Sequence, residues 1–182
     1  MDAARASWPS VAVLFLKGPE SSDPRSVGHG YPAWAYANEM VGSFFVGMVE
    51  SAYGTSALVI DGGEVYLQRT QAEFTDWYNW MKTGIALNGG PIVPSGAVTS
   101  QIYNATVNVA NQVYDRDYKD TAHSYPVFPA STLASLLTMS RNATDKYHWL
   151  YSESCDAIGG NAATRLPACS AAWLAAVRGA VK

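Results

Sequence analysis

The strongest pattern in the sequence is a helical one between residues 33 and 52. Apolar side chains recur there at helical spacing, as at Val41, Phe45 and Val49. Such spacing places them on one face, which must be buried against other elements. Pro32 suits the first helical position, because the amide N–H that it lacks would have no partner there. We therefore predict an amphipathic helix over residues 33–52 that packs onto a core.

Two other segments predict β-structure. Residues 11–16 are continuously apolar and end at a Lys-Gly-Pro tripeptide, which is typical of a short buried strand. Residues 57–60 and 64–69 are separated by an Asp-Gly-Gly tripeptide, which accepts the positive φ that tight hairpin turns require. The sequence thus predicts a strand followed, after the long helix, by a β-hairpin.

Further elements follow from local signals. Thr70 and Glu73 have the spacing of a capping box, in which each side chain accepts a hydrogen bond from the backbone N–H of the other residue. We expect a helix from there to about Lys82. The remaining expected elements are a short helix over 131–142, a strand within 146–153 and an Ala-rich helix over 168–181.

Residues 98–114 fit two patterns. As a helix they place Ile102, Thr106, Val109 and Val113 on one face, and as a strand they alternate apolar and polar side chains. Seventeen residues is long for a strand, so the helix is favoured. The fold class predicted for the whole chain, residues 1–182, is α+β. It is a single mixed domain, predominantly helical, with a small antiparallel sheet or hairpin and long irregular loops.

Charged side chains are scarce. They make up 15% of the 182 residues, against about 25% in ordinary soluble domains, whereas Trp, Tyr and Phe number 6, 11 and 5. Aromatic residues are enriched where one protein surface covers another. Part of the apolar surface is therefore expected to be covered by protein partners or by self-assembly, with packing of the rings into one core as the alternative.

Several partners and locations are disfavoured. The net charge of −3, without a basic block, argues against nucleic-acid binding through a basic patch. No signal peptide, membrane span or cofactor is expected, so we predict a chain that is cytoplasmic or assembled into a particle. Cys155 and Cys169 could close a disulfide loop in an oxidising compartment, but free thiols are favoured without a leader.

Three sets of residues are candidates for chemistry. Asp115, Asp117 and Asp120 lie close together in one loop, as carboxylates that hold a hard cation often do, although the EF-hand glycine and glutamate are missing. His29, between two glycines, could act as a general base. Cys155 or Cys169 could pair with His123 or His148 as a thiol and imidazole, but the zinc spacings are absent.

The leading functional hypothesis is a non-enzymatic structural or assembly subunit of a larger particle, for example a viral coat or shell component. The first alternative is a small, hydrolase-like enzyme with a site near His29 and the 115–120 carboxylate loop. The second alternative is a binding module that uses exposed aromatic rings on sugars or peptides.

Overall fold

A computed structural model describes residues 10–16, 39–84, 100–156 and 167–180. Strands and helices alternate through these residues. In chain order they are β1 (Ala12–Phe15), α2 (Glu39–Ala52), β2 (Leu58–Asp61), α3 (Gln71–Asn79), the π-helical turn η4 (Trp80–Gly84), α5 (Ser100–Thr106), β3 (Val107–Val109), β4 (Asn111–Tyr114), α6 (Ala130–Asn142), β5 (His148–Tyr151) and α7 (Ala171–Ala180).

The described strands pair in parallel, so the prediction of an antiparallel sheet is wrong. β2 lies between β1 and β3 and pairs in parallel with both. The predicted hairpin over 57–69 is wrong for the same reason. After β2 the chain does not fold back but continues alongside the β1 segment. The N–H groups of Gly62 and Glu64 donate to the carbonyls of Phe15 and Leu16, respectively. A helix between two strands permits this parallel pairing.

The second sheet continues from the first. β3 and β4 are separated only by Ala110, whose N–H bonds to the Asp61 carbonyl at 2.7 Å. β3 pairs with β2 on one side of this break, and β4 pairs in parallel with β5 on the other. The predicted strand within 146–153 is confirmed as β5, and one segment of chain thus joins the two halves of the molecule.

Residues 100–114, the described part of the ambiguous segment, adopt both conformations in turn, so the favoured single helix is wrong beyond Thr106. The first part of the segment is helix α5, and the second part is β3 and β4. Tyr103 of α5 and Val107 of β3 are both buried in the core beneath α2. The periodicity was ambiguous because the segment contains a complete short helix and a complete strand.

The local helix signals are confirmed. The capping box forms, with the Thr70 side chain accepting from the Glu73 N–H and the Glu73 carboxylate accepting from the Thr70 N–H. Helix α2 lies within the predicted range 33–52, and α7 lies within the predicted range 168–181. Helix α6 begins one residue before the predicted range 131–142 and ends with it. The predicted start of the first helix, at residue 33, lies outside the described residues.

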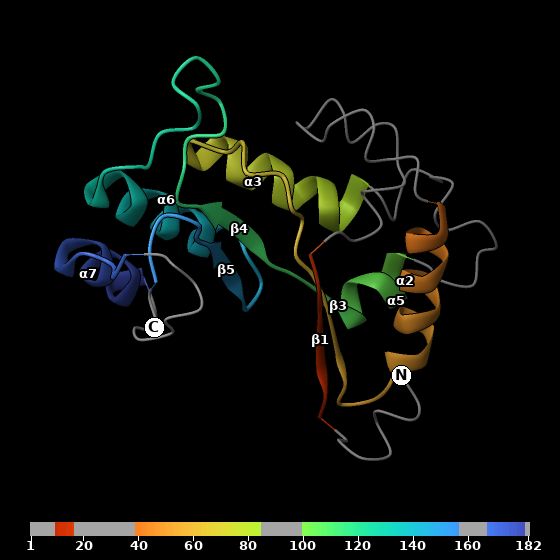
Figure 1. Cartoon of the computed structure of the whole chain (residues 1–182). Coiled ribbons are helices and arrows are strands. Elements are labelled where there is room, and N and C mark those ends of the chain that lie inside the picture. The colour runs from red at the N-terminus through yellow and green to blue at the C-terminus, as the bar shows by residue number, and fades with distance from the viewer. Residues whose placement is uncertain (1–9, 17–38, 85–99, 157–166, 181–182) are drawn as a thin grey trace.

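Two hydrophobic cores flank the junction of the sheets. α2 and α5 cover one face of the first sheet around Phe45 and Val59, and α3, α6 and α7 enclose the second around Phe74 and Leu133. Figure 1 shows α6 and α7 on the left and α2 and α5 on the right, with α3 running along the top between them. Within the residues described, no helix is both long enough and apolar enough to cross a membrane.

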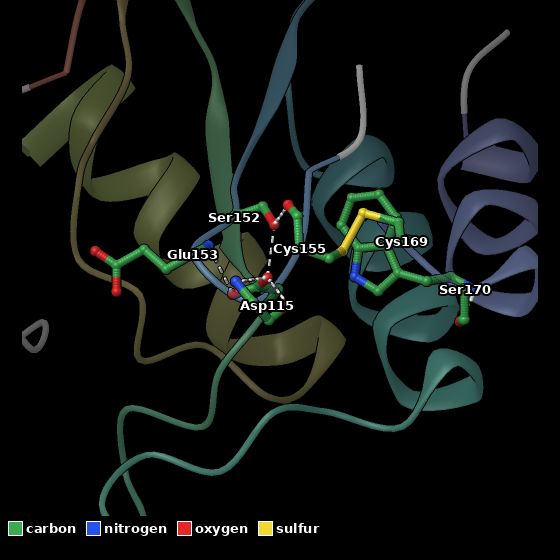
Figure 2. Close-up of a disulfide and its surroundings, with 8 residues drawn as sticks. Asp115, Ser152, Glu153, Cys155, Cys169 and Ser170 are labelled. Carbon is green, nitrogen blue, oxygen red and sulfur yellow. Dashed lines mark hydrogen bonds between the residues drawn. A yellow bond between two sulfur atoms is a disulfide. The ribbon is translucent and has the colours of Figure 1, made fainter. Parts of the chain in front are cut away.

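The prediction of free thiols is wrong. Cys155 and Cys169 form a disulfide, with their Cα atoms 4.9 Å apart (Figure 2). Backbone bonds between the segments bring the cysteines together, since the Asp156 N–H donates to Pro167 O and Asp156 O accepts from the Cys169 N–H. The disulfide therefore ties the chain after β5 to the start of α7.

Candidate functional site

Aromatic side chains gather where β4 and β5 end. Tyr114 is the last residue of β4 and Tyr151 the last of β5, and Trp149 lies two residues before it. Other segments bring three more tyrosines to the same place. We call this group of rings the tyrosine cluster; it consists of Tyr66, Tyr114, Tyr118, Tyr125, Trp149 and Tyr151. The carboxyl ends of parallel strands are where open α/β sheets usually bind ligands.

Tyr66 lies at the centre of the tyrosine cluster. Its ring centroid is 5.2 Å from that of Tyr114, 5.8 Å from that of Trp149 and 5.9 Å from that of Tyr151. Its backbone has φ 62°, in the left-handed region that non-glycine residues seldom adopt. The Arg69 guanidinium donates to the Tyr66 carbonyl at 3.0 Å and holds this turn. The unusual backbone conformation thus accompanies the packing of the ring among its neighbours.

Two glutamates fix the hydroxyl groups of the cluster. Tyr66 Oη donates to Glu64 Oε1 at 2.7 Å, and Tyr151 Oη donates to Glu153 Oε1 at 2.9 Å. Tyr114 Oη donates to the other oxygen of the Glu153 carboxylate. Burial, and then the hydrogen bond to Glu64, raise the pKa of Tyr66. The hydrogen bonds from Tyr114 and Tyr151 lower the pKa of Glu153. Neutral phenols of Tyr114 and Tyr151 therefore donate to the ionised carboxylate of Glu153 at neutral pH.

The turn that carries Glu153 is anchored on Asp115, the first residue after β4. Asp115 is fully buried, and its carboxylate accepts from Ser152 Oγ at 2.7 Å, from the Ser154 N–H at 3.1 Å and from Ser154 Oγ. Figure 2 shows the Glu153 side chain extending away from this anchor. The buried carboxylate is paired with donors, as a buried charge requires. Asp115 thus positions the backbone from which Glu153 reaches the tyrosines.

The loop after Asp115 presents the outer rings. Tyr118 and Tyr125 stack with their centroids 4.7 Å apart and their planes at 15°. The Asp117 N–H donates to the Pro126 carbonyl at 2.8 Å, and the Asp117 carboxylate pairs with Arg69 at 2.8 Å. Tyr118, Tyr125 and Tyr151 remain 43%, 38% and 43% exposed. These rings are ordered by contacts with each other and with carboxylates, yet they stay open to solvent.

The predicted carboxylate loop does not converge on one point. Asp115 accepts from the turn after β5, Asp117 pairs with Arg69, and Asp120 lies 2.7 Å from the ring of His123. Within the described segments, no group of three or more His, Cys, Asp or Glu side chains is arranged to hold a metal ion. The three aspartates instead fasten the loop that carries Tyr118 and Tyr125.

The other predicted site residues are scattered. His29 lies outside the described residues. Cys155 is bonded to Cys169, and His123 is 76% exposed beside Asp120, so neither is placed as part of a thiol and imidazole pair. His148 is half-buried at the start of β5, the opposite end of that strand from Tyr151.

Sequence reasoning identified the aromatic richness but missed Tyr66, Glu64 and Glu153 as site residues. The alternation of Tyr147, Trp149 and Tyr151 indicated a strand, and it is the signal that could have pointed to this edge. The two glutamates have no motif, because their role depends on rings up to 39 residues away in sequence.

A scan of protein-family models, a search of curated proteins and a search of solved structures each found no match to this chain. The fold and the tyrosine cluster are therefore the basis for a functional proposal.

Proposed function

We propose that this protein is a binding module that recognises a saccharide on the tyrosine cluster. The observation that carries the proposal is the exposure of Tyr118, Tyr125 and Tyr151, although each ring is fixed by stacking or by a carboxylate. Exposed rings whose positions are already set lose little conformational entropy on binding. A preformed apolar platform is thus available to a ligand.

The polar groups of the cluster suit a ligand rich in hydroxyls. A pyranose ring has apolar C–H faces that stack on a tyrosine ring and hydroxyls at its edge that donate hydrogen bonds. Glu64 and Glu153 supply carboxylate acceptors beside the rings. A few well-placed polar groups around an apolar surface are typical of small-molecule sites. The carboxylates also disfavour an anionic ligand, which supports a neutral saccharide.

The disulfide also supports a module that works outside the reducing cytoplasm. Disulfides persist in secreted and other oxidising compartments, and saccharides are abundant ligands of proteins found there. The cytoplasmic location expected from the sequence is accordingly not the one that we propose.

Binding of neutral oligosaccharides tests the proposal. We would titrate the purified, oxidised protein with tetramers of β-1,4-linked glucose, mannose and N-acetylglucosamine by calorimetry. Loss of one stacking ring in Tyr118→Ala should weaken the tightest of these complexes by about tenfold, which corresponds to a lost contact worth about 1.4 kcal/mol. Tyr53→Ala, which removes an exposed tyrosine at the end of α2, is the matched control and should bind as the wild type does.

Two results would overturn the proposal. One is that none of the three oligosaccharides binds at millimolar concentration. The other is equal binding by the wild type and Tyr118→Ala, with thermal unfolding showing that both are folded.

Assembly is a second candidate function, supported by apolar side chains at the other end of the molecule. Leu14 and Leu16 of the β1 segment are 43% and 47% exposed, and Phe44 of α2 is 62% exposed. Among the described strands β1 lies at the edge of its sheet, and an exposed apolar edge is a common site of pairing with another chain. We infer that a second copy of this chain covers it.

Sedimentation over a range of concentrations tests the assembly candidate. The wild type should associate as concentration rises, and Leu14→Lys should shift it to monomer. Val127→Lys adds the same charge at a 44% exposed apolar residue in the loop of the tyrosine cluster and should not change association. A wild type that stays monomeric at every concentration would contradict this candidate.

A further inference from the structure

A pocket of about 380 Å³ lies at the amino end of β5, opposite the end that carries the tyrosine cluster. The end of α6, the turn before β5 and the end of α7 form its wall. The described residues that line it are Arg141, Thr144, Asp145, Lys146, Tyr147, His148 and Ala180. Its volume falls in the range of small-molecule sites, about 300–1,000 Å³. The pocket shares no residue with the tyrosine cluster.

Two side chains that line the pocket have buried polar atoms without a hydrogen-bond partner. These atoms are Arg141 Nε and His148 Nδ1. Arg141 meets the Ala180 carbonyl through another atom, since its Nη1 donates to that oxygen at 3.3 Å. Buried polar groups nearly always have a partner in folded proteins, so two orphans in one pocket point to a ligand.

The charges of the lining residues do not cancel. Among the described lining residues Asp145 carries the one carboxylate, and its oxygens already accept from Lys82 Nζ at 2.7 Å, from Tyr78 Oη at 2.8 Å and from the Val109 N–H at 2.8 Å. Lys146 Nζ lies 5.3 Å from the centroid of the Tyr147 ring. Because Asp145 is already paired with Lys82, Arg141 and Lys146 leave the described lining of the pocket with excess positive charge.

We propose that this pocket binds a small molecule through an oxyanion group, held by Arg141, Lys146 and His148. A guanidinium presents its N–H groups as a fork that matches two oxygens of a phosphate or carboxylate, and charge-assisted bonds of this kind are strong. The lysine ammonium adds a mobile positive charge, and the imidazole gains a second donor when protonated. The volume leaves room for an organic part beyond the anionic group. The inference is independent of the saccharide proposal.

The test uses the full-length, oxidised protein and three defined probes. Inorganic phosphate, glycerol 3-phosphate and malonate would be titrated separately, with the imidazole resonances of His148 followed by NMR. At least one probe should shift the His148 resonances in a saturable way. Phosphate alone would identify a free anion, tighter glycerol 3-phosphate a phosphate ester, and tighter malonate a carboxylate, and each of these results supports the proposal.

Matched variants show whether the lining cations bind the probe. Arg141→Gln should weaken binding by about tenfold or more, because it removes a charge-assisted pair. Arg178→Gln removes the same charge from an exposed residue of α7 and should bind as the wild type does. If Arg141→Gln fails to fold, Lys146→Gln replaces it, since Lys146 is exposed, with Lys119→Gln as its control.

No saturable shift with any of the three probes at 50 mM, or about that concentration, would overturn the proposal, because a weaker interaction is not specific recognition. Equal affinity in the wild type and in the folded Arg141→Gln or Lys146→Gln variant would also overturn it. A shift that is lost equally in Arg178→Gln would show a general effect of charge and contradict a built site.

Discussion

The two ends of β5 differ in every property that matters for recognition. At the carboxyl end, packed rings and two glutamates form an exposed, acidic platform. At the amino end, Arg141, Lys146 and His148 line a hollow with unpaired polar atoms and excess positive charge. The strand that carries both ends, His148–Tyr151, has only four residues. One short strand in a parallel sheet thus presents opposite charge at its two ends, because the ends face different sets of loops.

The largest expected effect comes from the disulfide, which connects both ends. Cys155 follows β5, and Cys169 precedes α7, whose Ala180 lines the basic pocket. Replacing both cysteines with serine should lower the free energy of unfolding by about 3 kcal/mol, as expected for a loop of this length. Urea denaturation of the variant and of the oxidised wild type measures the difference.

Reduction of the wild type should reproduce the effect of the double serine variant. A loss below about 1 kcal/mol would mean that the two segments are held by other contacts. It would remove the disulfide as the link between the two ends of β5.

Asp115→Asn should give the next largest effect and should act on the carboxyl end alone. The buried carboxylate accepts from Ser152 and Ser154, and an amide cannot accept all of these bonds. We expect a loss of about 2 kcal/mol, the usual range for hydrogen bonds to a charged group. Urea denaturation measures the loss, and NMR of the His148 ring should show an unchanged basic pocket. A His148 shift as large as those around Glu153 would contradict the separation of the two ends.

Much of the local structure could be predicted from the sequence, whereas the pairing of the strands could not. The capping box of Thr70 and Glu73 is complete within four residues, so local chemistry determines it. The Asp-Gly-Gly tripeptide predicted a hairpin, but a turn signal does not specify its partner. The succession of an apolar segment at 11–16, a helix and a strand at 57–60 was the better guide, because it is typical of a parallel crossover. The prediction that 11–16 is a buried strand is wrong, since β1 is a half-exposed strand at the edge of its sheet among the described strands.

The tyrosine cluster was hidden for a similar reason. Arg69 meets Asp117 across 48 residues, and Tyr114 meets Glu153 across 39. These contacts depend on which strands are neighbours and on the left-handed backbone of Tyr66. Composition indicated that aromatic rings would lie at a surface, and only the three-dimensional arrangement locates that surface.

Tyr114→Phe should have a smaller effect, again at the carboxyl end. It keeps the ring and removes one hydrogen bond to Glu153, at an expected cost of about 1 kcal/mol. The pKa of Glu153 should rise toward its ordinary value, because the Tyr114 hydroxyl is the largest cause of its lowering. A carboxyl group whose pKa is lowered in the folded protein stabilises the fold at pH values above its unfolded pKa. This stabilisation is lost as the pH falls through the folded pKa. The variant and wild type should therefore converge in acid.

Urea denaturation at several pH values measures this effect. Tyr53→Phe serves as the control, because Tyr53 is an exposed tyrosine directly after α2, and it should match the wild type at every pH. If the free energies of unfolding of Tyr114→Phe and the wild type differed by the same amount down to about pH 2, the effect of the Tyr114 hydroxyl would not come from Glu153.

The smallest expected effect is a change in titration at the amino end. Burial, and then the positive charge of Arg141, lower the pKa of His148 below its ordinary value of 6.5. Arg141→Gln should raise it, and Arg178→Gln should not. Since the native pKa is lower than the unfolded one, this contribution to stability is complete above pH 6.5 and declines as pH falls below it. NMR titration of the imidazole measures the shift, and a wild-type His148 that titrates above 6.5 would contradict the account.

One experiment tests most directly whether the two ends of β5 recognise different chemistry. ¹⁵N-labelled protein would be titrated with the best-binding oligosaccharide and, separately, with the best-binding oxyanion, and the backbone amide shifts mapped. The saccharide should move amides of residues 64–66, 114–118 and 151–153, and the oxyanion those of 141–148 and 180. Overlapping shifts, or shifts confined to other parts of the chain, would contradict the assignment of two sites to one strand.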